Sequence, residues 1–232
     1  MNFYDVVKKR RSVRKFTSEA IPEEVMHRIL DAGLLAPNSS NLQPWEFYWV
    51  KNQLKKNELA LACFSQKAAT TASELIVAVS RIDTWKRNRD LLMMALEAQG
   101  KIPSAVRTYY KKAIPLAYYQ DPLGLASLVR KIVFTCVGFF RPTPRKTSRA
   151  DLFETVSKTT ALACENIMLA IVAEGYDSCP MEGFDEVRVK KILGLNSQSH
   201  IVMVIGIGKG DPTGIFGKQV RLNKSLFIHE VI

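Results

Sequence analysis

Histidine and cysteine are scarce and scattered in this sequence of 232 residues. There are three histidines and four cysteines, and no two cysteines form a Cys-x-x-Cys pair. No histidine stands near a cysteine at zinc-ligand spacing, and no cysteine or serine carries a local activating signature. We therefore expect neither a metal site nor nucleophilic catalysis, and we expect inert thiols in a reducing cytoplasm. The cysteines are Cys63, Cys136, Cys164 and Cys179.

Long apolar runs are also missing. The basic N-terminal stretch is not followed by an apolar segment, so no signal peptide is predicted. The longest uncharged apolar piece, Ile132–Phe140, has about half the length that a bilayer-spanning helix needs. The glycines between residues 206 and 210 lack the Gly-x-Gly-x-x-Gly spacing of a dinucleotide-binding loop. We expect no transmembrane segment, while peripheral contact with a membrane surface stays open.

Positive charge, by contrast, is abundant. Lysine and arginine number 33 against 22 acidic residues, which gives a formal charge of +11. Such an excess suits nucleic acid, a membrane surface or an anionic cofactor. Only the cluster at 107–112 interleaves aromatics with basic residues as nucleic-acid-binding surfaces do, so no nucleic acid is expected. The clusters lie at 8–15, 86–89, 107–112 and 141–149.

The hydrophobic pattern predicts one α+β domain over 1–232. Periodic apolar residues, together with glycines suited to closing helices, set most of the element boundaries. Residues 85–148 are rich in basic and aromatic residues and read as two or three helices, inserted at one end of the core. Helices are expected at 2–9, 22–36, 53–73, 151–174 and 185–193, and strands at 46–51, 75–80 and 200–206.

The basic segment at residues 10–14 reads Arg-Arg-Ser-Val-Arg. A guanidinium group presents a planar fork that holds phosphate oxygens at two points, and a serine hydroxyl adds one more donor. Arg10, Arg11, Ser12 and Arg14 are therefore candidates for binding an anionic group. Taken alone, the segment is equally typical of a solvated basic surface.

A second candidate is the loop between Pro37 and Pro44. It offers five polar side chains just before an aromatic-rich strand, and such a loop can give donors and acceptors to the edge of a planar heterocycle. Without context it is also compatible with an ordinary capped turn. The five residues are Asn38, Ser39, Ser40, Asn41 and Gln43.

Taken in order, these blocks resemble the FMN-dependent nitroreductase family. The first is Arg-Arg-Ser-Val-Arg-Lys-Phe from residue 10, and the second is Ala-Pro-Asn-Ser-Ser-Asn-Leu-Gln-Pro-Trp-Glu-Phe from residue 36. Pro-Met-Glu-Gly-Phe at 180–184 is similar to the family's Pro-x-Glu-Gly-Phe. The strand at 204–209 with the later Arg221 is similar to its C-terminal block. The resemblance covers about 1–80 and 151–232.

The resemblance implies a three-layer α+β fold. Its central mixed sheet of four or five strands is flanked by helices, and two chains form an intertwined homodimer. The segment Leu226–Ile232 would reach across to the partner, and its apolar character independently favours docking.

The resemblance also implies roles for individual residues. Arg10, Arg11 and Ser12 would contact the phosphate and ribityl chain of FMN, and Arg14 would sit beside the pyrimidine edge of the ring. The polar loop at 38–43 would come from the partner subunit. Residues near the flavin N5 would be Pro180, Met181, Glu182 and Gly183, and Gln66 would supply a side-chain amide. Arg221 would return to the phosphate; Gln219 stands where the family has a lysine, and Lys218 lies one residue earlier.

The activity implied is oxidation of NADH or NADPH through bound FMN by a ping-pong mechanism, with a nitroaromatic, a quinone or a similar small acceptor. The flavin would carry the chemistry, with no catalytic side chain required. Two alternatives remain. One is another branch of the same family, which dehalogenates iodotyrosine, cleaves flavin or oxidises small rings. The other is a basic binding module without redox activity.

Overall fold

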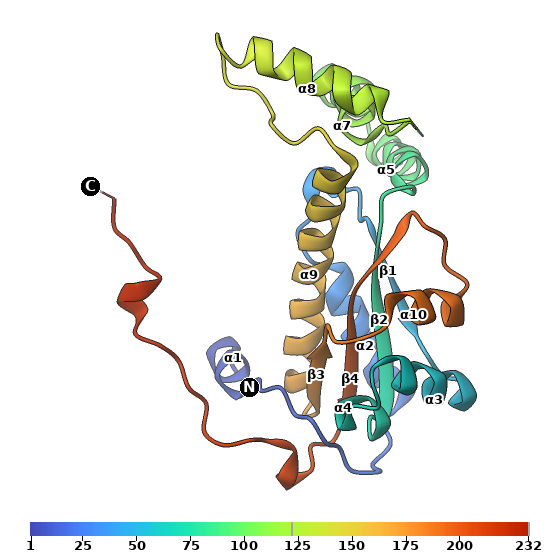
Figure 1. Cartoon of the computed structure of the whole chain (residues 1–232), viewed down its shortest axis with the longest axis vertical. Helices are drawn as coiled ribbons and strands as arrows, with labels where there is room; N and C mark the ends of the chain where they lie inside the picture. The colour runs from blue at the N-terminus through green and yellow to red at the C-terminus, as the bar shows by residue number, and fades with distance from the viewer. Residues whose placement is uncertain (122, 232) are drawn as a thin grey trace.

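The computed structural model describes residues 1–121 and 123–231 (Figure 1). Four strands form one sheet in the order β1-β2-β4-β3. The strands are β1 (Trp45–Trp49), β2 (Glu74–Arg81), β3 (Asp177–Met181) and β4 (Ser199–Gly208). The helices of the core are α1 (Phe3–Lys9), α2 (Glu23–Leu34), α3 (Gln53–Ala62), α4 (Lys67–Thr70), α9 (Arg149–Ala173) and α10 (Glu186–Leu193).

All three strand pairings are antiparallel, whereas a mixed sheet was expected. For two of these pairings the reason is that the connection between the consecutive strands begins and ends at the same end of the sheet. β1 leads to β2 through α3 and α4, and β3 leads to β4 through α10. Such returns produce antiparallel neighbours without a crossover. A parallel bridge outside these strands joins Ser12 and Ser178.

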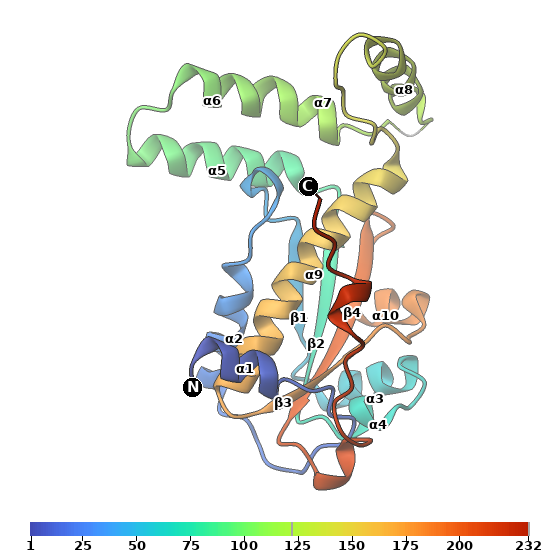
Figure 2. The same ribbon diagram turned by 90° about the vertical axis from the view of Figure 1, so that its left-hand side faces the viewer.

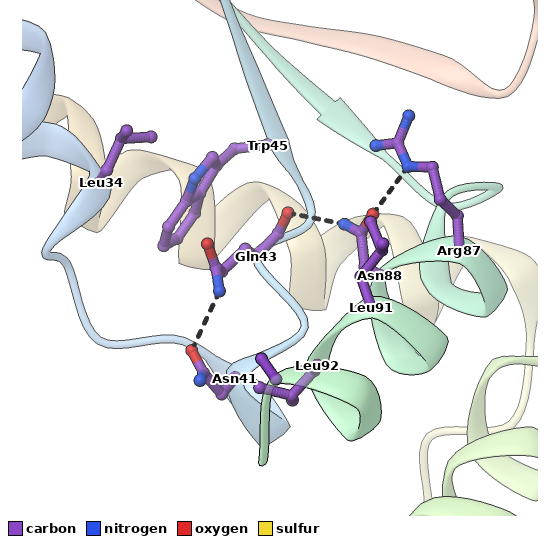
Figure 3. Close-up of a pocket in the computed structure, with 9 residues that line it drawn as sticks. Leu34, Asn41, Gln43, Trp45, Arg87, Asn88, Leu91 and Leu92 are labelled. Carbon is purple, nitrogen blue, oxygen red and sulfur yellow. Dashed lines mark hydrogen bonds between the residues drawn. The ribbon is translucent and has the colours of Figure 1, made fainter. Parts of the chain in front are cut away.

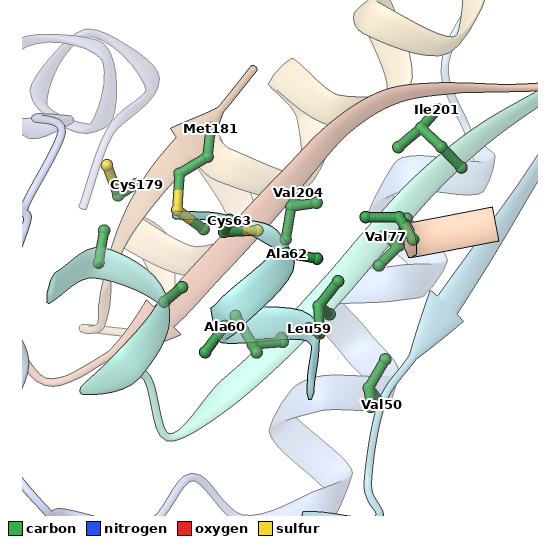
Figure 4. Packing of buried hydrophobic residues seen from close by; sticks show 14 of the residues in the cluster. Val50, Leu59, Ala60, Ala62, Cys63, Val77, Cys179, Met181, Ile201 and Val204 are labelled. Atoms are coloured by element: carbon green, nitrogen blue, oxygen red, sulfur yellow. The ribbon is translucent and has the colours of Figure 1, made fainter. Parts of the chain in front are cut away.

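The two faces of the sheet carry separate hydrophobic clusters. Along β2, Leu75, Val77 and Val79 pack against α3, α4 and α10, as Figure 4 shows for Val77 and the α3 residues. The intervening Ile76 and Ala78 face α2 and α9. This alternation is the two-residue period of a strand buried on both faces, and it produces the three layers helix, sheet and helix.

The long helix α9 lies across one face of the sheet (Figure 2). It starts with a capping box in which Ser148 and Asp151 satisfy each other's main-chain N–H groups. Gly33 of α2 lets the two helices approach closely, because a Cβ there would lie 2.6 Å from Ile167 Cγ1. By length and composition α9 could span a membrane, but half of its apolar window (50%) is buried in the core. It is therefore a core helix.

The helix expected over 53–73 is divided into α3 and α4. Phe64 and Ser65 adopt positive φ angles of 56° and 52° between the two helices. A left-handed backbone at two consecutive residues cannot continue an α-helix.

The described residues 85–121 and 123–148 contain three helical stretches, which project at one end of the sheet (Figure 2). The first is α5 (Trp85–Gln99). The second joins α6 (Ser104–Thr108), the π-helix η2 (Tyr109–Ala113) and α7 (Ile114–Tyr118), and the third is α8 (Leu125–Val137).

The chain ends in a long segment that leaves the body after the short turn η3 (Pro212–Gly214) (Figure 1). It includes one further turn, η4 (Lys224–Leu226), and residues 215–231 are exposed along their length. The predicted docking segment Leu226–Ile232 lies here, with Ile232 outside the described residues.

Candidate functional site

The basic segment Arg10–Arg14 leaves α1 and runs beside β3. The Val13 N–H donates to the Ser178 carbonyl at 2.9 Å, and the Arg14 N–H donates to the Gly214 carbonyl at 2.8 Å. Further on, the Phe16 N–H donates to Thr71 Oγ1 at 3.0 Å. Hydrogen bonds of the main chain therefore fix the course of the segment, whatever its side chains are.

The guanidinium groups of this segment have no acidic partner. Arg10, Arg11 and Arg14 form no ion pair with any residue in 1–121 or 123–231. Arg11 Nη2 donates to the Gly217 carbonyl at 2.7 Å, and the Arg14 guanidinium lies 5.1 Å from the centre of the Phe216 ring. Three arginines free of carboxylates form a donor set suited to a phosphate or another anion.

Asp211 organises the turn from which the C-terminal segment leaves. Its carboxylate accepts a hydrogen bond from the Thr213 N–H at 2.8 Å and lies 3.1 Å from Lys15 Nζ. The Thr213 bonds, aided by Lys15, lower the pKa of Asp211 to about 2. Among the described residues, Asp211 is the only acidic residue that forms an ion pair with the basic cluster at 8–15. It pairs with Lys15, and the three arginines stay without an acidic partner.

Gln66 and Gly183 meet beside this segment. Gln66 Nε2 donates to the Gly183 carbonyl at 2.8 Å and to the Cys63 carbonyl at 3.0 Å. Gln66 and Arg14 both line a cavity of about 430 Å³. The structure therefore brings together three predicted site residues that are far apart in sequence. The cavity is also lined by Lys15, Lys67, Ala68, Thr213, Gly214 and Phe216.

The remaining residues of the Pro-Met-Glu-Gly block divide between the core and the surface. Pro180 and Met181 end the edge strand β3, where the missing N–H of a proline is tolerated. The Met181 side chain is buried in the core, so only its main chain is available to a ligand (Figure 4). Glu182 and Gly183 are exposed beyond the strand.

The loop at residues 38–43 forms the second group of candidate residues and contains the 3₁₀ turn η1 (Ser39–Asn41). Asn38 Oδ1 accepts a hydrogen bond from the Gln43 N–H at 2.8 Å. Ser40, Asn41 and Gln43 adopt positive φ angles of 59°, 52° and 47°. Residues other than glycine keep such angles only where their surroundings enforce them, and functional sites are common places for this.

Side chains of residues 85–110 enforce the loop conformation. Asn88 Nδ2 donates to the carbonyls of Leu42 and Gln43 at 2.9 and 3.1 Å. The Tyr110 hydroxyl donates to the Ser40 carbonyl at 2.9 Å, and the Tyr109 hydroxyl lies 2.6 Å from Ser40 Oγ. The helices at 85–118 thus hold this loop in place.

A second cavity, of about 400 Å³, opens between the loop and α5 (Figure 3). Asn41 and Gln43 meet there, with Gln43 Nε2 donating to Asn41 Oδ1 at 3.4 Å. Arg87 brings a cation to the rim and donates from Nε to Asn88 Oδ1 at 2.9 Å. The other lining residues are Leu34, Trp45, Leu91, Leu92 and Ala95.

The two groups of residues lie at opposite ends of β2. The Arg81 N–H donates to the Pro44 carbonyl, which places the loop beside the last residue of the strand. Thr71, which accepts from Phe16, lies just before the first residue, Glu74. The eight residues of β2 span about 25 Å at 3.3 Å per residue. One chain therefore does not place its amide loop beside its own arginines.

The two C-terminal candidates, Lys218 and Arg221, lie on the exposed segment. Lys218 directly follows Gly217, whose carbonyl accepts from Arg11, so it starts close to the basic segment. Arg221 Nη1 donates to the neighbouring Val220 carbonyl, and no hydrogen bond among the described residues joins it to residues 10–14. The structure of one chain thus leaves Arg221 apart from the other arginines.

The thiols do not contribute nucleophiles to either cavity. Cys63, Cys164 and Cys179 are buried, and Cys136 is exposed on α8. Burial raises the pKa of Cys63 to about 11 and that of Cys164 to about 12. Both are therefore protonated thiols at neutral pH, which is the inert state that the sequence predicts.

Several residues at these cavities carry no signal that sequence reasoning could use. Lys67 and Phe216 belong to the first cavity, and Arg87, Asn88 and Tyr109 hold or border the loop. Arg87, Asn88 and Tyr109 lie within the basic clusters at 86–89 and 107–112, but the positive charge of these clusters does not indicate that they contact the loop at 38–43.

Comparison with known proteins decides the family. The model of the Nitroreductase family matches residues 7–209. The chain belongs to this family. The matched region contains Arg10–Arg14, the amide loop, Gln66 and the Pro-Met-Glu-Gly block.

Relatives and solved structures agree with the family assignment. A Bacillus subtilis protein named "Putative NAD(P)H nitroreductase YdgI" is 28% identical over 216 residues, covering 92% of this chain and 90% of that protein. The NADH dehydrogenase of Thermus thermophilus is 26% identical over 200 residues, covering 86% and 82%. The structure of an Exiguobacterium sibiricum protein described as "a putative nitroreductase in complex with FMN" has a TM-score of 0.75 and 25% identity. It covers 100% of this chain and 98% of that one. The predicted nitroreductase-like α+β fold is confirmed, and the family is one of oxidoreductases.

Proposed function

We propose that this protein is an FMN-dependent oxidoreductase that takes hydride from NADH or NADPH and reduces a small acceptor. The acceptor classes we favour are nitroaromatics and quinones, with donor and acceptor using one pocket in turn. Support comes from the family, from relatives named for NAD(P)H chemistry, and from a relative with FMN bound. The observation that carries the proposal is the set of three arginines without acidic partners among the described residues, of which Arg14 lines one cavity with Gln66.

The residues present fit the chemistry of FMN. The phosphate carries negative charge, and Arg10, Arg11 and Ser12 offer guanidinium and hydroxyl donors to it. Lys218 follows Gly217, whose carbonyl accepts a hydrogen bond from Arg11, so Lys218 can add a further cation near the phosphate. The ring edge needs neutral donors and acceptors, which the Gln66 amide and the main chain at Glu182 and Gly183 can supply.

The flavin, when bound, supplies the hydride and electron transfer. Arg14 would hold positive charge beside the pyrimidine edge, where it favours electron uptake by the ring. The Phe216 ring lies over this exposed guanidinium, with 5.1 Å between the ring centre and the guanidinium carbon. The protein side chains would thus bind and orient the flavin, and none would act as a nucleophile.

We further propose that the complete site forms between two chains. FMN is too short to span the separation of about 25 Å between the arginines and the amide loop of one chain. A second chain would supply Asn38, Ser39, Ser40, Asn41 and Gln43 to the arginines of the first. The C-terminal segment supports such a dimer, because Phe227, Ile228 and Val231 are apolar and exposed on the single chain. Arg221 on this segment would reach the phosphate only in that assembly.

The test is reconstitution of the purified protein with FMN. We expect one FMN per chain, bleaching of the flavin absorbance by NADH or NADPH without oxygen, and return of colour on adding a quinone or a nitroaromatic. Parallel lines in double-reciprocal plots would show the ping-pong order. Protein that stays colourless after incubation with FMN would refute the cofactor assignment.

The shared site has its own test. An Arg10→Ala chain and an Asn41→Ala chain are each expected to be weakly active. Mixing and reassociating them should restore activity, since each mixed dimer has one site without either substitution. No recovery in mixed dimers that are verified by mass would contradict a site formed between subunits.

We expect the enzyme in the cytoplasm.

A further inference from the structure

Helix α8 buries one arginine and leaves an apolar face exposed. The buried residue is Arg130, whose Nη1 donates to the carbonyls of Leu116 and Tyr119, both at 2.8 Å. Its Nη2 donates to the Thr147 carbonyl at 3.1 Å. The acceptors lie before the helix, at residues 116 and 119, and after it, at residue 147. Together these hydrogen bonds fix how α8 is rotated about its own axis.

The opposite side of α8 is a continuous apolar stripe. Its residues follow one another at steps of three and four, which places them on one helical face. The five aliphatic members are between 47% and 58% exposed, and the turn after the helix adds Phe139 and Phe140 at 80% and 91%. The α8 stripe comprises Leu125, Leu128, Val129, Ile132, Val133 and Cys136.

The segment around the stripe holds most of the net charge of the protein. Residues 101–149 contain ten lysines and arginines and one acid, Asp121, and ten minus one is +9 of the total +11. Lys131, on α8, and Arg141, just after the two phenylalanines, have no hydrogen-bonded or ionic side-chain partner among the described residues. Free cations therefore border an exposed apolar surface.

We infer that the α8 stripe and the basic residues around it bind the surface of a membrane containing anionic phospholipid. An apolar helix face inserts to shallow depth between headgroups, and the surrounding lysines and arginines contact the anionic headgroups.

Neither a nucleic acid nor a contact of the stripe with the same stripe of a second copy matches both features. Nucleic acid would use the positive charge and leave the apolar stripe in water. A two-fold contact of the stripe with itself would bring two segments of charge +9 together. α8 also lies at the end of the molecule remote from the N-terminus (Figures 1 and 2), where a flat surface can approach it.

The first experiment is co-sedimentation of the full chain with vesicles. Vesicles of phosphatidylcholine and phosphatidylglycerol in equal parts should bind the protein, and pure phosphatidylcholine should bind it much more weakly. Leu128→Ser with Ile132→Ser should abolish sedimentation. Lys131→Ala with Arg141→Ala should weaken binding about fivefold for each charge removed, and salt should weaken it further.

A matched control is Leu54→Ser with Val187→Ser, two exposed apolar residues on α3 and α10. It should bind vesicles like the wild type, and all variants should keep the wild-type helical signal and thermal midpoint. FMN binding provides an independent readout, since the proposed flavin residues lie elsewhere and loss of vesicle binding should leave it unchanged.

The exposed thiol gives a second measurement. Cys136 lies on the α8 stripe, whereas the other three cysteines are buried. An environment-sensitive dye on Cys136 should shift its emission to the blue on anionic vesicles and become protected from a water-soluble quencher. No vesicle binding, equal loss in the control pair, or a stripe variant that changes the oligomeric state instead would overturn the inference.

Discussion

The arginine segment and the amide loop are held in place by different kinds of interaction. Residues 10–16 are fixed by main-chain hydrogen bonds to Ser178 and Gly214. The loop at 38–43 is fixed by side chains of Asn88, Tyr109 and Tyr110. Both segments are polar and carry candidate ligand-binding residues. The loop depends on three side chains elsewhere, whereas residues 10–16 depend on one, the Thr71 hydroxyl that accepts from the Phe16 N–H.

Because of this difference, substitutions in the arginine segment test ligand binding, whereas substitutions around the amide loop test how the loop is held in position. Side chains of the arginine segment can be removed without moving its backbone, so their loss measures their contribution to ligand binding. The loop contains three residues with positive φ, and it needs its partners to keep that conformation. Substitutions outside the loop should therefore affect the loop more than substitutions within the arginine segment affect the fold.

The largest effect is expected from Arg10→Ala with Arg14→Ala. Loss of two charge-assisted contacts of about 2 kcal/mol each should weaken FMN binding about a thousandfold. The thermal midpoint of the free protein should stay unchanged, because the main chain positions the segment. Titration of flavin fluorescence measures the affinity. The control, Lys8→Ala with Lys9→Ala, removes the same charge from exposed positions on α1, and an equal loss there would contradict specific contacts.

Gly214→Ala tests the dependence of the arginine segment on its backbone. A Cβ at this position would lie 2.6 Å from the Lys15 carbonyl oxygen and 2.9 Å from Val13 Cγ1. We expect this overpacking to lower the free energy of unfolding by about 2 kcal/mol in urea denaturation. Lys15→Ala, which removes a partly exposed ion pair at the same turn, should cost under about 1 kcal/mol. Equal costs would mean that side chains hold this segment after all.

Asn88→Ala tests the support of the amide loop. Two carbonyls would lose their donor, so the free energy of unfolding should fall by about 1.5 kcal/mol, and turnover should fall because the loop relaxes. Chemical denaturation and steady-state NADH oxidation measure the two effects. Asn57→Ala, an amide paired with Gln53 on α3, is the control and should change neither.

The smallest effect concerns pH and Asp211. The pKa of Asp211 is lowered from 3.8 to about 2, so its stabilisation is complete above about pH 4 and is lost as the pH falls towards 2. The thermal midpoint of Asp211→Asn should therefore lie slightly below that of the wild type at neutral pH, and the gap should close on acidification. A gap that stays constant with pH would show that the carboxylate charge does not hold this turn.

The order and type of most elements could be predicted from the sequence. Apolar periodicity marked α2, α9 and β2, and Gly175 and Gly194 marked helix ends where φ is indeed +87° and +65°. Prediction failed where the backbone departed from the average for its residues. Phe64 and Ser65 break the expected helix with positive φ, which no residue type there announces.

The sequence by itself determined the family and the candidate ligand residues, because both depend on which side chains occur and in what order. Tertiary structure decided how they are grouped. Gln66 meets Gly183 across more than a hundred residues, whereas Arg14 and Asn41 lie at opposite ends of β2. It also decided that α8 turns Arg130 inward and its leucines outward, since carbonyls at positions 116, 119 and 147 surround the guanidinium. Such contacts between residues distant in sequence depend on how the helices and strands pack, so the local sequence pattern does not predict them.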